Sequence, residues 1–154
     1  MRFKSMVFWL SAALFAESAM AQVRLDGDVE YGVFESPEVE LEAGQRLLRT
    51  GAQSIKHTTD IPARLGTKFG LRYSLVGKRE GDTPLTLLYL TPGVVTADGV
   101  RHDKFEVVQA LAPAAAQDVM AFEFTEPHEL VRGEWHFFVF QGDRKLAEQR
   151  FNIR

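Results

Sequence analysis

Alternating apolar and polar positions run through most of the chain with a period of two residues. Residues 69–75 (FGLRYSL) place large apolar side chains at odd positions and small or polar ones at even positions. Residues 120–124 (MAFEF) alternate in the same way, with Phe122 and Phe124 on the apolar side. This period is typical of a β-strand with one buried face. Further strands are predicted at residues 28–34, 84–90 and 104–111.

One segment is apolar on both of its faces. In the run Trp135–Phe140 (WHFFVF), the odd and the even positions both carry large apolar or aromatic side chains. A strand of this kind is typical of the middle of a sheet, where both faces are covered. Residues 135–140 are therefore predicted to form a central strand.

Turn signals separate the predicted strands. Residues 77–84 (GKREGDTP) read as a polar loop, and Gly142-Asp143 is the signal of a two-residue hairpin. Thr91-Pro92-Gly93 and Asp98-Gly99 are turn signals on either side of the short apolar piece Val94-Val95.

Helical periodicity is nearly absent from residues 22–154. The alanine-rich residues 110–117 contain Pro113, which limits them to a short turn. The predicted fold class is therefore all-β, an antiparallel β-sandwich of about seven to nine strands.

A local pattern near the end of the chain favours an immunoglobulin-like sandwich. Residues 130–135 (LVRGEW) place a leucine, a glycine turn and an aromatic residue just before a strand. Immunoglobulin-like domains use such a corner before their penultimate strand, where a tyrosine usually pins the turn. Trp135 stands in that place here, so the usual hydroxyl bond of the corner is not assumed for this chain.

Three segments together resemble a known family. They are residues 133–154 (GEWHFFVFQGDRKLAEQRFNIR), residues 31–34 (YGVF), and residues 61–66 (IPARLG) followed by Phe69-Gly70. They are similar to a family of small exported bacterial proteins of unknown function. The resemblance covers nearly all of residues 22–154, and it implies an immunoglobulin-like domain of about 130 residues without catalytic residues.

The first 21 residues have the three parts of a secretory signal peptide. Arg2 and Lys4 precede an apolar run from Met6 to Ala16, and Ala19-Met20-Ala21 is a small-x-small cleavage site. The alternative is a membrane anchor, but this run is shorter than the ~20 residues that a bilayer needs. Cleavage is expected between Ala21 and Gln22.

The expected organisation is a signal peptide at residues 1–21 and one domain at residues 22–154. Localisation follows as periplasmic or secreted, with no stable membrane insertion after cleavage. The sequence contains no cysteine, so the domain is expected to fold on core packing without disulfides or thiolate metal sites.

Charge excludes one class of partner. The 154 residues carry 18 basic and 21 acidic side chains, a net charge of −3, and the basic residues are scattered. Nucleic-acid binding needs Lys and Arg clustered on one surface. No nucleic-acid partner is expected.

Motifs for catalysis and cofactors are weak. The run Glu126–Glu129 (EPHE) could surround a cation, but a solvated turn is the simpler reading. Ser54, His57 and Asp60 have the residue types of a triad, yet triads are assembled from distant segments. The acidic run 35–42 lacks the spacing of a calcium loop. No enzyme activity, metal or cofactor is predicted.

Three residues are candidate contacts for a ligand or partner. Arg64 and Lys68 lie beside glycine turns and could form a small site for an anion. Trp135 could stack on a sugar or a peptide, although inter-sheet packing is the commoner fate of such a residue.

The function predicted is that of an exported, non-enzymatic binding domain of the bacterial cell envelope. Its expected partner is another envelope protein, or a component of the cell wall or outer membrane. Two alternatives stay open: a periplasmic assembly chaperone that acts through an edge strand, and an envelope hydrolase. The oligomeric state is not determined by the sequence.

Overall fold

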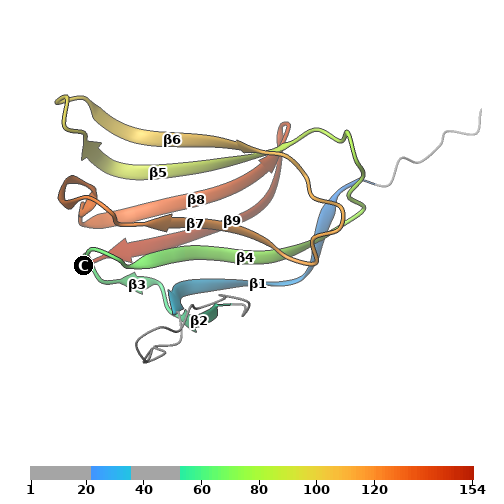
Figure 1. The fold of residues 1–154 in the computed structure, drawn as a ribbon, viewed down its shortest axis with the longest axis horizontal. Helices are drawn as coiled ribbons and strands as arrows, with labels where there is room; N and C mark the ends of the chain where they lie inside the picture. Colours follow the sequence, from blue (N-terminus) through green and yellow to red (C-terminus); the bar gives the residue numbers. More distant parts are fainter. Residues whose placement is uncertain (1–21, 36–52) are drawn as a thin grey trace, which may run out of the picture.

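The computed structural model describes residues 22–35 and 53–154, which form two packed β-sheets (Figure 1). The four-stranded sheet has the order β2-β1-β4-β7, and the five-stranded sheet has the order β3-β9-β8-β5-β6. The strands are β1 (Arg24–Glu35), β2 (Ser54–His57), β3 (Asp60–Ile61), β4 (Lys68–Val76), β5 (Leu85–Val95), β6 (Arg101–Gln109), β7 (Asp118–Glu123), β8 (Gly133–Gln141) and β9 (Arg144–Ile153). The predicted all-β sandwich is confirmed. The predicted signal peptide and residues 36–42 of the acidic run lie outside the described residues.

Alternation along β4 produces one half of the core. Phe69, Leu71, Tyr73 and Leu75 are at most 5% exposed and face the other sheet. Because β1 and β7 pair antiparallel with β4 on its two sides, this row lies at the middle of the four-stranded sheet. A buried row on a central strand brings the most apolar area out of water.

The strand β8 lies between β9 and β5, so its predicted central position is confirmed (Figure 1). Trp135, Phe137 and Val139 are completely buried and face the four-stranded sheet. The other row, His136, Phe138 and Phe140, lies half-buried on the outer face of the five-stranded sheet. The neighbouring strands β5 and β9 flank this outer row on its two sides. Among the described residues, no second layer covers it.

One turn prediction was wrong. Thr91-Pro92-Gly93 does not end a strand, because β5 continues to Val95 with a shift of register between Leu90 and Val94. The Thr91 hydroxyl accepts a hydrogen bond from the Gly93 amide and donates one to the His102 carbonyl. The proline and glycine therefore mark a β-bulge, which the same residue types also favour.

The other connections agree with the sequence. The β8–β9 hairpin turns through Gly142 and Asp143, and the φ of 56° at Gly142 is one that glycine adopts readily. At Gly70 the reason for glycine is space, because a Cβ there would lie 2.0 Å from the Met120 carbonyl oxygen on β7.

No helix in the described residues is long and apolar enough to span a membrane.

Candidate functional site

Trp135 serves the core rather than the surface. Its side chain is completely buried, and its Nε1–H donates a hydrogen bond to the Val131 carbonyl at 3.0 Å. The ring packs edge-on against Phe69 and Phe124 of the opposite side of the core. The predicted contact with a sugar or peptide is therefore wrong for this residue, because no part of it reaches the surface.

Arg64 and Lys68, in contrast, line one hollow of about 460 Å³ on the surface. Arg64 lies on the connection between β3 and β4, and Lys68 is the first residue of β4. Lys56 of β2 adds a third cation to the lining. Sequence reasoning missed Lys56, because only the β1–β2 pairing brings it beside the β3–β4 connection.

Backbone hydrogen bonds hold the β3–β4 connection in place. The amide of Gly66 donates to the Phe124 carbonyl at 2.8 Å, and the amide of Phe124 donates to the Thr67 carbonyl at 3.0 Å. The amide of Ala63 donates to the carbonyl of Arg154 at 2.8 Å. The loop that carries Arg64 is thus tied to neighbours on both sides, and little order remains to be gained on binding.

Among the described residues, the lining of the hollow has more cations than carboxylates. Besides its three basic residues it is lined by Glu35 and Asp60, and Asp60 already forms an ion pair with Arg154 at 2.8 Å. Arg64 is exposed, and among the described residues its guanidinium has no side-chain hydrogen bond or ion pair. An anion in the hollow would therefore meet an uncompensated guanidinium.

Lys68 is positioned more firmly. Its ammonium donates to Gln53 Oε1 at 3.2 Å and lies 5.3 Å from the centre of the Phe34 ring. Phe34 and Lys68 also line a second hollow of about 330 Å³, which contains Arg72. The two hollows therefore adjoin at Lys68.

Arg72, which lines the second hollow, is held in place by two hydrogen bonds. Its Nε donates to Glu30 at 2.7 Å, and its Nη1 donates to the Gln53 carbonyl at 2.7 Å. The hydrogen bond lowers the pKa of Glu30 and raises that of Arg72. Glu30 already neutralises the guanidinium of Arg72. The positive charge that remains available to an anion therefore lies in the first hollow, at Arg64.

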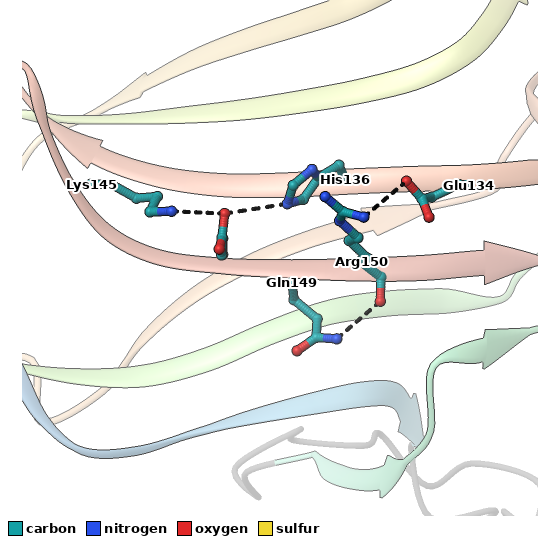
Figure 2. A network of polar contacts seen from close by, with 6 residues as sticks. Glu134, His136, Lys145, Gln149 and Arg150 are labelled. Carbon is teal, nitrogen blue, oxygen red and sulfur yellow. Dashed lines mark hydrogen bonds and ion pairs between the residues drawn. The ribbon is translucent and has the colours of Figure 1, made fainter.

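A second polar cluster lies on the outer face of the five-stranded sheet (Figure 2). Glu148 forms ion pairs with Lys145 at 2.9 Å and with His136 at 3.4 Å, and Arg150 reaches Glu134 at 3.8 Å. Burial, followed by the charge of Arg150, lowers the pKa of His136. These groups pair with each other, so the cluster fits a structural role on the surface.

The remaining candidate motifs are used locally. Glu129 Oε2 accepts hydrogen bonds from the amides of Thr125 and Glu126, which caps the short 3-10 helix Pro127–Glu129. Within residues 22–35 and 53–154, no three His, Cys, Asp or Glu side chains gather as a metal site would require.

The three triad-type residues are likewise engaged with different partners. Ser54 donates to the Glu35 carbonyl, the His57 ring lies 4.0 Å from that of Tyr31, and Asp60 pairs with Arg154. These contacts hold the short strands β2 and β3 against their neighbours.

The fold defines an immunoglobulin-like β-sandwich domain. A domain of unknown function, DUF3859, matches residues 22–153, and the chain belongs to this family. The family predicted from the sequence is thereby confirmed.

The chain also matches solved structures. An immunoglobulin-like protein from Pseudomonas aeruginosa is 64% identical, with a TM-score of 0.78, over 88% of this chain and 99% of that chain. The alkylpurine DNA glycosylase AlkC of Pseudomonas fluorescens, bound to DNA with an abasic site analog, is 14% identical over 87% of this chain and 31% of that chain. Its TM-score of 0.36 supports no structural argument. A search of curated proteins gave no match.

Proposed function

We propose that this chain is an exported, non-enzymatic binding domain of the bacterial cell envelope. Its partner places a negatively charged group in the hollow formed by Lys56, Arg64 and Lys68. The observation that carries the proposal is the surplus of cations in the part of the lining that the structure describes, where three basic residues face two carboxylates and one of these is already paired.

Binding is favoured over catalysis by the chemistry of the lining. A hydrolytic site needs a nucleophile, a base within hydrogen-bond reach and a group that orients the base. Of the described residues that line the hollow, two are threonines and none is a histidine, and the carboxylates lie on different strands. Two lysines on strands and an arginine on a tied loop can orient an anion, which requires no proton transfer.

Export supplies the compartment in which such a partner would be met. The signal-peptide pattern of residues 1–21 supports delivery to the periplasm or beyond, with a mature chain that begins at Gln22. Anionic groups abundant in the envelope are the phosphates of lipopolysaccharide and the carboxylates of peptidoglycan. Both share the chemistry that a guanidinium and two ammonium groups recognise.

The test uses protein purified from the periplasmic fraction, whose mass should be that of residues 22–154. Calorimetric titrations with lipopolysaccharide vesicles and with soluble peptidoglycan fragments distinguish the two sources of the anion. We expect one of them to bind, and Arg64→Glu to weaken it by about tenfold or more, since charge reversal costs at least ~1.4 kcal/mol.

Arg24→Glu is the matched control, because it makes the same charge change at an exposed position at the start of β1, outside the hollow. Failure of both ligands to bind, or equal losses in the two variants, would overturn the anion site. Recovery of the precursor mass from the cytoplasm would overturn the proposed export.

A further inference from the structure

The strand β6 forms an open edge of the five-stranded sheet (Figure 1). It is nine residues long and, among the described residues, pairs only with β5. It contains no proline, and the bulge in this hairpin lies in β5, so β6 stays regular. The backbone groups on its outer side are therefore available for another strand.

Exposed apolar side chains concentrate at this edge. Val107 and Val108 are 49% and 69% exposed on β6, and Val95 and Val100 flank its start at 47% and 49%. Phe105 lies between core and edge, half-buried against the ring of Phe122. An added strand would remove part of this surface from water.

The charges of β6 determine which strand fits. Edge strands usually carry charges that repel an incoming strand. Here Lys104 and Glu106 have opposite signs, lie on the same face 3.7 Å apart, and flank Phe105 symmetrically. In an antiparallel pairing centred on Phe105, Lys104 of each copy stands directly opposite Glu106 of the other.

Neighbouring registers of the same pairing are unfavourable. A shift that centres the pairing on Lys104 places two ammonium groups opposite each other, and one centred on Glu106 opposes two carboxylates. Directly opposed cross-strand side chains are close enough for like charges to destabilise a pair and opposite charges to stabilise it. Of these three registers, only the one centred on Phe105 opposes unlike charges.

We propose that two copies of this domain associate through β6, antiparallel and centred on Phe105, so that their five-stranded sheets become continuous. The association is isologous, since the contact between Lys104 of one copy and Glu106 of the other occurs twice across a two-fold axis. Its interface lies on β5 and β6, whereas the cationic hollow involves β1 to β4. The pairing is therefore independent of anion binding.

The test compares charge variants of the purified mature chain by analytical ultracentrifugation over a wide range of concentration. Lys104→Glu and Glu106→Lys should each raise the dimer dissociation constant by about tenfold or more, because each creates two like-charge oppositions. An equimolar mixture of the two variants should dimerise again, since both carboxylates of the first variant then face ammonium groups of the second. Both wild-type side chains are more than half exposed, so the variants are expected to fold.

The mixing experiment separates this interface from others. A monomeric wild-type protein would overturn the proposal, as would single variants that dimerise normally or a mixture that stays monomeric. A monomer whose β6 amide signals shift only when an extended peptide is added would also overturn it, and would assign the edge to another chain, as an assembly chaperone requires.

Discussion

At the scale of the residue, one part-buried hydrogen bond shows how this domain varies a common corner. The indole of Trp135 donates to the carbonyl of Val131, four residues before it. A tyrosine corner uses a phenol to reach upstream backbone in the same way. Because tryptophan stands where tyrosine is usual, the sequence provided no basis for assuming the hydroxyl bond, and in the structure the indole N–H is the donor instead.

We expect Trp135→Phe to lower the free energy of unfolding by about 1–3 kcal/mol beyond the packing loss, since the Val131 carbonyl loses its buried donor. The measurement is urea denaturation followed by circular dichroism. Tyr73→Phe is the control, because the hydroxyl of Tyr73 is buried with no hydrogen-bond partner among the described residues. Its removal should be neutral or stabilising, and equal losses in both variants would contradict the role of the indole bond.

At the scale of the element, a buried ion pair fastens the β4–β5 loop to β7. Lys78 Nζ lies 3.1 Å from Asp118 Oδ2 and donates to the Ala115 carbonyl at 2.6 Å. Their side chains are only 4% and 3% exposed. The segment 77–84 was predicted to be a polar loop. The side chain of Lys78 departs from that expectation because it is buried rather than exposed to solvent.

Asp118→Ala should destabilise the domain by about 3–5 kcal/mol, because it leaves the ammonium of Lys78 buried without its counter-ion. The double variant Lys78→Met/Asp118→Leu should cost much less, since both charges are removed together. Arg150→Ala, which breaks the exposed pair with Glu134, should cost less than about 1 kcal/mol. Urea denaturation measures all three, and a double variant as unstable as Asp118→Ala would show that the pair does more than compensate its own charges.

At the scale of the whole molecule, several pKa shifts act in the same direction. The pKa of His136 is lowered mainly by burial, and those of Glu30 and Glu148 are lowered by hydrogen bonds from Arg72 and Lys145. In each case the unfolded chain binds protons more readily than the folded one. Stability contributed by such groups is present at higher pH and is lost on acidification.

We expect stability to fall in two stages as the pH decreases. The first begins near the ordinary pKa of histidine, 6.5, as protonation of His136 favours the unfolded chain. The second sets in as the pH approaches 4.5, the ordinary pKa of a glutamate, at which half of the Glu30 and Glu148 side chains are protonated in the unfolded chain. Urea midpoints measured across this range should fall in both stages for the wild type. His136→Gln should remove the first stage alone, and an unchanged profile would assign it to other groups.

Much of the fold was predictable because its causes are local. A period of two residues places Phe69, Leu71 and Tyr73 on one face whatever lies opposite them. Gly142-Asp143 produces a hairpin through backbone conformation alone. Prediction was weaker at Thr91-Pro92-Gly93, since proline and glycine allow both a turn and a bulge, and pairing with β6 decides between them.

The candidate site was also predictable only in part. Arg64 and Lys68 lie four residues apart in the sequence, and the structure places both in one hollow. Lys56 joins them only through the pairing of β1 with β2, which no local pattern encodes. Trp135 was assigned to the surface as one alternative, and the packing of two sheets buries it completely.

By itself, the sequence determined the all-β class, the central place of residues 135–140 and the family. Alternation, turn signals and family motifs are local patterns that can be recognised without knowing which segments are in contact. Only the tertiary structure decided that the indole of Trp135 closes the corner, that Lys78 is buried against Asp118, and that three cations share a hollow. It also decided which strands stand at the sheet edges. The physical reason is that these features depend on contacts between distant segments, whose geometry is fixed when the two sheets pack.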